Sequence, residues 1–87
     1  MTSIFRNFFG KVIYTCHACG ASQRIPVRRV HVFERFHQLT RGEALLIACP
    51  SCRNGLQIPS RYMTHTGHLV DITAQTLPEN AVIHSFY

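Results

Sequence analysis

Residues 12–26, VIYTCHACGASQRIP, decide the fold together with a second stretch of the same design, residues 45–59, LLIACPSCRNGLQIP. In both stretches an apolar run leads into two cysteines that are separated by two residues. Six residues after each cysteine pair, an isoleucine is followed by a proline, and the matched positions are 33 residues apart. The two stretches therefore predict two copies of one structural unit, related by a local two-fold axis.

The cysteines have the spacing of a tetrahedral thiolate site. Two intervening residues allow one tight turn to present both sulfurs of a pair, and two such turns hold one zinc ion with Zn–S distances of about 2.3 Å. Four thiolates also leave no open coordination position, so a catalytic zinc is not expected. We expect one structural zinc ion, held by Cys16, Cys19, Cys49 and Cys52.

Three other uses of the cysteines remain open in the sequence. The first is two disulfides, which would need an oxidising compartment, although residues 1–11 lack the apolar core of a secretory signal. The second is two separate sites, in which each cysteine pair is completed by two histidines, His31 with His37 and His65 with His68. The third is a redox-active dithiol, which is disfavoured because no alternating strand–helix pattern surrounds either pair.

The length of the chain also favours a structural metal. A domain of 87 residues has a small core and usually needs an additional stabilising cross-link, such as a bound zinc ion. No run of apolar residues approaches the ~20 needed to cross a bilayer, so we expect no membrane span. With reduced thiols and no visible leader, the expected location is cytoplasmic.

Hydrophobic periodicity predicts a small α+β fold. Two β-hairpins carry the cysteine pairs, with strands at 11–15 and 20–25 and at 43–49 and 53–58, and each proline that comes next lies at a strand end. A helix over 27–41 is inserted between the hairpins and ends at a Gly42 cap. Its apolar face is formed by Val27, Val30, Phe33, Phe36 and His37, and its outward face by Arg28, Arg35, Gln38 and Arg41. A loop at 62–68 precedes a C-terminal pair of short strands at 69–73 and 81–86.

These elements divide the chain into three parts. Residues 1–11 form an N-terminal apolar docking segment, residues 12–61 the metal-binding core with its inserted helix, and residues 62–87 a C-terminal β extension. The apolar side chains of the first segment have the spacing i, i+1, i+4, i+5 of a helical stripe that fits a partner groove: Ile4, Phe5, Phe8 and Phe9.

Residues 14–61 resemble the zinc-ribbon superfamily, and are similar to short bacterial zinc-ribbon domains with the pattern CxxC…CPxC. The resemblance is carried by the two cysteine pairs and by flanking positions that share the family's small or apolar character: Gly20, Ala21, Ile25, Pro26, Gly42, Ile47, Pro50, Leu56 and Ile58. It implies a structural zinc ion on the four cysteines and a role in binding rather than in catalysis. The segment between the pairs is longer than is usual in that group, so the helix is an addition. The fold alone does not decide among DNA, RNA and protein partners.

The charge of the chain favours an anionic partner. The net charge is +5, from eight arginines and one lysine against four acidic residues. Arginines cluster in the sequence near the exits of the cysteine turns, where they would form one basic face: Arg24, Arg28, Arg29, Arg53 and Arg61. Pairing with Glu34, Glu43 and Asp71 would neutralise only some of them.

No catalytic constellation accompanies these features, and no site for a small-molecule substrate is indicated. We therefore expect a non-enzymatic binding module that docks onto a protein or larger assembly as an adaptor, small subunit or regulator. The alternative is a nucleic-acid-binding regulator of transcription or translation, in which the basic face contacts phosphates.

Overall fold

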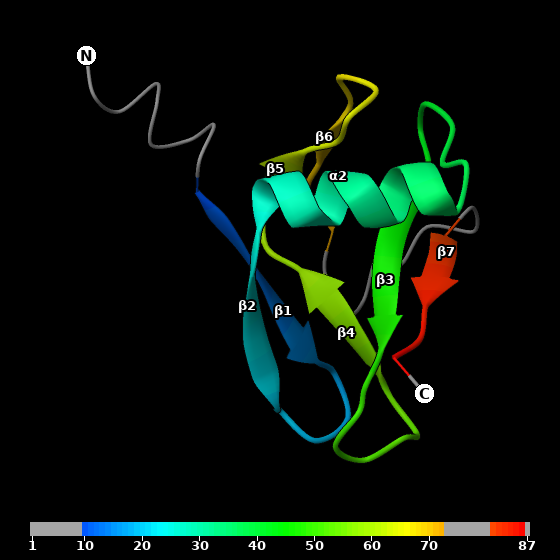
Figure 1. Cartoon of the computed structure of the whole chain (residues 1–87). Coiled ribbons are helices and arrows are strands. Elements are labelled where there is room, and N and C mark those ends of the chain that lie inside the picture. The colour runs from blue at the N-terminus through cyan, green and yellow to red at the C-terminus, as the bar shows by residue number, and fades with distance from the viewer. Residues whose placement is uncertain (1–9, 73–80, 87) are drawn as a thin grey trace.

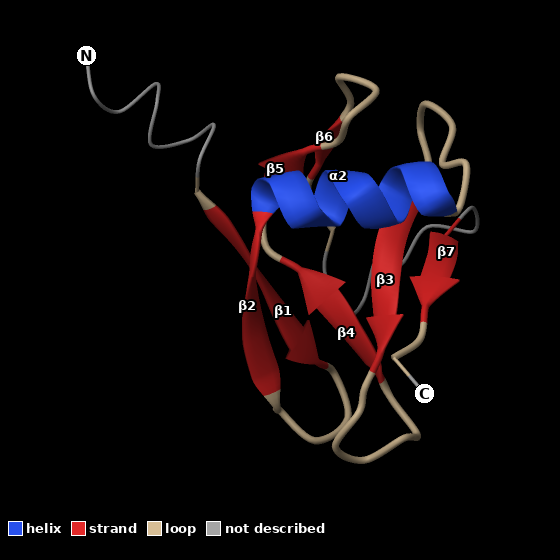
Figure 2. Ribbon diagram, viewed as in Figure 1, coloured by secondary structure: helices blue, strands red, loops and turns tan. Residues whose placement is uncertain are grey.

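A computed structural model describes residues 10–72 and 81–86, so the predicted stripe at Ile4, Phe5, Phe8 and Phe9 lies outside it. The described residues form a small α+β fold with one helix and a five-stranded mixed sheet (Figures 1 and 2). The strand order of this sheet is β2-β1-β4-β3-β7, and β5 and β6 form a separate two-stranded sheet. The elements are β1 (Lys11–Cys16), β2 (Ser22–Pro26), α2 (Val27–Phe36), β3 (Ala44–Ala48), β4 (Leu56–Pro59), β5 (Tyr62–Met63), β6 (Leu69–Val70) and β7 (Ala81–His84).

The two repeated stretches form the centre of the sheet. The first makes the antiparallel hairpin β1–β2 and the second the antiparallel pair β3–β4. The halves meet where β1 pairs antiparallel with β4, so that Tyr14 lies opposite Pro59 and Cys16 opposite Gln57. Pro26 and Pro59 are the last residues of their strands, as predicted, because proline cannot donate to the ladder. This arrangement brings both cysteine turns to the same end of the sheet (Figure 1).

The core lies between α2 and one face of the sheet. Side chains alternate along β1, where Val12, Tyr14 and Cys16 are buried and the residues between them are exposed. The buried Tyr14 hydroxyl donates to the carbonyl oxygen of Leu45 at 3.0 Å, which links the two halves beneath the helix. Burial raises the pKa of Tyr14 well above its ordinary value.

The helix begins at Val27 as predicted, but the predicted end at residue 41 is wrong, because α2 ends at Phe36. The Leu39 N–H donates to the Glu34 carbonyl and the Gln38 N–H to that of Arg35, a pattern that closes a helix with one residue of positive φ. That residue is Gln38, with φ of 55°, rather than Gly42.

The predicted apolar face of the helix is also corrected. Phe36 is 75% exposed, whereas Glu34 is completely buried beside Val27 and Val30. The reason is a set of hydrogen bonds from the β5–β6 region. Glu34 accepts one from the Tyr62 hydroxyl at 2.5 Å and one from the His65 N–H at 2.7 Å, and His65 Nδ1 lies 2.8 Å from its carboxylate. A buried acid with these partners fixes the rotation of the helix and turns Phe36 outward.

The C-terminal part differs from the prediction of one pair of short strands. Part of the predicted loop at 62–68 is strand β5, which pairs antiparallel with β6. The last strand, β7, joins the main sheet instead, parallel to β3, with Leu45 opposite Val82 and Ile47 opposite His84. The His84 ring also stacks on Phe33 of α2 at a centroid distance of 4.2 Å, so β7 is held by both the sheet and the helix.

Candidate metal centre

The two cysteine turns share one backbone hydrogen bond. In the first turn the Gly20 N–H donates to the Cys16 carbonyl at 3.0 Å, and in the second the Arg53 N–H donates to the Cys49 carbonyl at 3.1 Å. The residue after the second cysteine has positive φ in both turns, 80° at Gly20 and 60° at Arg53. Each turn therefore curls around its own cysteine pair and directs both sulfurs to the same side.

The four sulfurs form one cluster. Cys16 Sγ lies 3.7 Å from Cys52 Sγ, and Cys19 Sγ lies 3.6 Å from Cys49 Sγ. All four ligand atoms lie within 4.8 Å of one another. A regular tetrahedron with Zn–S bonds of about 2.3 Å has edges of about 3.8 Å, so the cluster has the size needed to hold one metal ion. Both distances are far longer than the about 2.05 Å of a disulfide bond, and no two of the four cysteines are joined by a disulfide.

Backbone N–H groups stabilise the thiolate form of two ligands. The N–H groups of Ala18 and Cys19 point at Cys16 Sγ, at 3.3 and 3.4 Å. The pKa of Cys16 is lowered chiefly by the Cys19 N–H, and the corresponding Cys52 N–H lowers the pKa of Cys49 to about 6. The pKa of Cys19 responds first to the Ala21 N–H, which lowers it, but desolvation and hydrogen bonds to the other sulfurs outweigh this and raise it to about 11. A cationic metal ion would favour the thiolate in all four ligands.

Two residues outside the predicted ligand set bring the turns together. A Cβ on Gly55 would lie 2.5 Å from Cys16 Sγ and 2.8 Å from Ala18 Cβ, so only glycine allows the second turn to approach the first this closely. Gln57 is 2% exposed, and its amide donates to the Ala21 carbonyl at 3.3 Å and accepts from Gln23. In the sequence the Asn54-Gly55 pair indicates only a turn, because its contact with the other half is invisible there.

The histidines take other roles. Within residues 10–72 and 81–86, the four cysteines are the only group of three or more cysteine, histidine, aspartate or glutamate side chains that lie close enough to share one ion. His31 is hydrogen-bonded to the Met63 carbonyl at 2.8 Å and His37 to His84 at 2.9 Å. His65 contacts Glu34, and His68 lies in the connection between β5 and β6. The alternative of two cysteine–histidine sites is therefore wrong.

The five predicted arginines lie on different elements. Arg24 is exposed on β2, and Arg28 and Arg29 are exposed in the first turn of α2. Arg53 belongs to the second cysteine turn, at the other end of the sheet from the start of α2 (Figure 1). Arg61 comes shortly after β4 and lies 3.7 Å from Asp71. Of the other acids that the structure describes, Glu34 is buried and Glu43 accepts a hydrogen bond from the Thr40 N–H.

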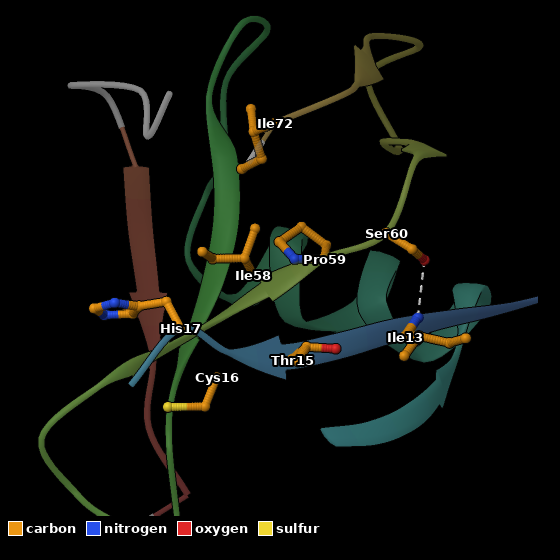
Figure 3. Close-up of a pocket in the computed structure, with 8 residues that line it drawn as sticks. All are labelled: Ile13, Thr15, Cys16, His17, Ile58, Pro59, Ser60 and Ile72. Atoms are coloured by element: carbon orange, nitrogen blue, oxygen red, sulfur yellow. Dashed lines mark hydrogen bonds between the residues drawn. The ribbon is translucent and has the colours of Figure 1, made fainter. Parts of the chain in front are cut away.

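The sheet face opposite α2 has a hollow of about 410 Å³ (Figure 3). Apolar side chains line much of it, Ile13 from β1, Ile58 from β4 and Ile72 from the segment after β6. Cys16 and His17 of the first cysteine turn form another part of the lining, so the hollow reaches the metal centre. Ser60 closes another side, where its hydroxyl accepts a hydrogen bond from the Ile13 N–H at 3.0 Å. Among the described residues that line the hollow, none is a carboxylate or a lysine, and the titratable side chains are Cys16 and His17.

Comparisons of the chain with protein-family models, with curated proteins and with solved structures found no match. Among the described residues, no helix has the length and apolar character required to cross a bilayer. The candidate site therefore rests on its geometry, which is that of four cysteines able to coordinate one metal ion.

Proposed function

We propose that the protein is a non-enzymatic zinc-ribbon module of the cytoplasm that docks onto a protein partner or assembly as an adaptor, small subunit or regulator. The observation that carries the proposal is the closed cluster of four sulfurs at one end of the sheet. Zinc is the metal that a four-cysteine tetrahedral set on two tight turns most commonly binds, and such sites are structural. A saturated site of this kind holds two hairpins together and leaves the rest of the surface for binding.

Exposed apolar side chains support a protein partner. Large hydrophobic residues are exposed on several elements, among them Phe36 at 75%, Val32 at 57% and Ile83 at 48%. A single exposed apolar side chain is common on any protein surface. Several of them beside arginines are typical of protein interfaces. The predicted N-terminal stripe at Ile4, Phe5, Phe8 and Phe9 lies outside the described residues and remains a prediction.

A nucleic-acid partner is the second candidate. It is favoured by Arg24, Arg28 and Arg29, which are exposed on adjoining elements. Contacts from such a set to phosphates would make the affinity fall steeply with salt, by roughly one log–log slope unit per contact. Docking on apolar side chains would instead depend weakly on salt.

Two measurements test the proposal. Native mass spectrometry should find one zinc ion per chain, and a chain that carries no metal, or two ions, contradicts the assigned site. Affinity purification with and without nuclease then separates the candidate partners. Retention of bound protein after nuclease is the expected result, and its loss, together with a steep salt dependence, would transfer the proposal to nucleic acid.

A further inference from the structure

The outward face of helix α2 has an unusual composition. Five residues of α2 are exposed, and their spacing of i, i+1, i+4, i+7, i+8 places them on one continuous stripe. Three are arginines and two are apolar, and none is acidic or neutral polar: Arg28, Arg29, Val32, Arg35 and Phe36. A surface helix normally directs mixed polar and charged residues to solvent, so this stripe is not an ordinary solvated face. We call it the Arg–Phe stripe.

The orientation of the stripe is fixed from the opposite side of the helix. The acid of α2, Glu34, is buried and bound by Tyr62 and His65. A rotation that hid Phe36 would pull this carboxylate away from both partners, at the cost of leaving a buried charge unpaired. The only ring contact of Phe36 among the described residues is with the edge of its neighbour His37, at 5.1 Å. The exposure of Phe36 is thus a property of the fold.

The stripe is positive along its whole length. Arg28 and Arg29 stand in the first turn, where no acidic residue and no side-chain cap offset the positive end of the helix dipole. Arg35 stands in the last turn. Along the same stripe, Val32 lies between Arg29 and Arg35, and Phe36 directly follows Arg35. The two apolar residues are one turn apart, about 6 Å along the axis, so they form one ridge that fits the groove of a second helix.

We propose that the Arg–Phe stripe is the docking surface of the protein and that it binds an amphipathic helix of a partner protein, in which apolar residues are flanked by glutamates and aspartates. The inference rests on the proposed protein-docking function and names its surface and the chemistry of its partner. Charge complementarity carries it, because three arginines around two apolar side chains are matched by carboxylates around an apolar ridge.

A protein helix explains the stripe better than a nucleic acid does. Phosphates would engage the arginines and a base could stack on Phe36, but the aliphatic Val32, which is 57% exposed, cannot stack on a base and would stay in water. A partner helix uses both kinds of residue, with Phe36 and Val32 as the desolvated centre and the arginines as the rim.

Photo-crosslinking identifies the partner segment. The full-length, metal-loaded chain carries a photoreactive amino acid in place of Val32 in one sample and of Leu69 in a control sample, because Leu69 is comparably exposed on β6. Both are irradiated in cell lysate, and the crosslinked peptides are sequenced. We expect the Val32 sample to yield partner segments with helical apolar periodicity and a clear excess of acidic residues, which the Leu69 sample does not yield. Basic segments or nucleotide adducts at Val32 would overturn the inference.

Matched variants then measure the contribution of the stripe to binding of the identified segment as a synthetic peptide. Val32→Ser with Phe36→Ser should weaken the affinity at least tenfold, since truncating a central apolar contact commonly changes it about tenfold. The control pair Met63→Ser with Leu69→Ser removes apolar side chains that are also about half exposed, and it should change the affinity less than about twofold because they lie outside the stripe. Unchanged metal content and circular dichroism show that both variants are folded.

The outcomes separate this inference from the proposed function. If nuclease-resistant protein binding persists unchanged in the Val32/Phe36 variant, the stripe is not the docking surface, although the module still binds protein. If all bound material is lost on nuclease treatment, the protein-docking function itself fails.

Discussion

The two halves of the metal centre share one fifteen-residue plan, yet they are not identical. In the first turn the Cys16 N–H donates to Ala21, five residues on, whereas the Cys49 N–H donates to Gly55, six residues on. The second turn is therefore one residue longer, and the extra residue allows Gly55 to lie against Cys16 of the first turn. Two turns of equal length would meet symmetrically, whereas here the longer second turn packs directly against the first, a contact that we call the nesting of the turns. An internal repeat thus fixes the ligands, while a small asymmetry determines how closely the halves can pack.

The halves also differ in the elements to which they lead. After the first Ile-Pro exit the chain forms helix α2, and after the second it forms the β5–β6 hairpin. The helix and the hairpin meet again through Glu34 of the helix and Tyr62 of the hairpin. Each half therefore contributes one partner to a polar contact at the opposite end of the sheet from the metal centre (Figure 1).

Loss of a ligand gives the largest expected effect. Cys49→Ser removes a buried thiolate that receives two backbone N–H groups, and Cys16→Ser removes its counterpart in the first half. Loss of a group that only hydrogen-bonds to a ligand lowers metal affinity by up to ~100-fold. Each of these ligand substitutions should lower the zinc affinity by more than that, and should unfold the metal end of the sheet. Competition with a chromophoric chelator measures the affinity. Full retention of zinc by either variant would contradict the four-cysteine assignment.

The nesting of the turns predicts the next effect. Gly55→Ala forces a methyl group against Cys16 Sγ and Ala18 Cβ, so it should destabilise the fold by about 1–3 kcal/mol and lower the zinc affinity. Gly67→Ala is the control, because its positive φ of 84° strains any side chain but its Cβ meets no atom within 4 Å. The control should reduce stability in denaturant titrations and leave the zinc affinity unchanged. Equal zinc affinities for the two variants would show that the close contact is unimportant.

Gly20 and Arg53 occupy the same position of the two turns, both with positive φ, so substitutions there compare the backbone strain of the turns. Gly20→Ala should destabilise the fold by about 1–2 kcal/mol, because a Cβ is disfavoured at φ of 80°. In the second turn the strain is already present, so Arg53→Gly should be more stable than Arg53→Ala by about 1 kcal/mol. Comparison of these two variants cancels the contacts of the Arg53 side chain. Thermal unfolding of the zinc-loaded proteins measures all three, and a more stable alanine variant at residue 53 would contradict the prediction.

The smallest effect concerns β7, which flanks only the second half. Desolvation and then the positive charge of His37 lower the pKa of His84. The folded protein therefore binds fewer protons than the unfolded chain, so this contribution to stability is complete above about pH 6.5 and is lost as the pH falls through the folded pKa. An NMR titration of the His84 ring should give a midpoint below that of an unfolded peptide. His37→Gln should raise the midpoint, and an unshifted midpoint in the native chain would exclude the effect.

Local patterns in the sequence predict the local features of the structure. The cysteine cluster, the strand ends at Pro26 and Pro59 and the start of α2 at Val27 all depend on residues a few positions apart. The end of the helix could not be predicted from such patterns, because Gln38 adopts the positive φ at which glycine is expected.

Features that depend on distant contacts are not predictable in this way. Periodicity assigns Phe36 to the core and leaves out Glu34, because it ranks an aromatic residue above an acid. The hairpin that satisfies Glu34 lies 28 and more residues further along the chain. The pairing of β7 with β3 escapes prediction for the same reason, since nothing local specifies a parallel partner.

The parallel pairing of β3 and β7 has a consequence for how the chain folds. Ala44 and Ala81 are partners although they lie far apart in the sequence, whereas the hairpin β1–β2 closes over a few residues. The entropy lost in closing a loop grows with its length, so the hairpins and the metal end can assemble before β7 has a template to join. In kinetic experiments the amides of β7 should acquire protection later than those of the hairpins, and until β7 pairs, the exposed edge of β3 is the point at which two chains could exchange strands.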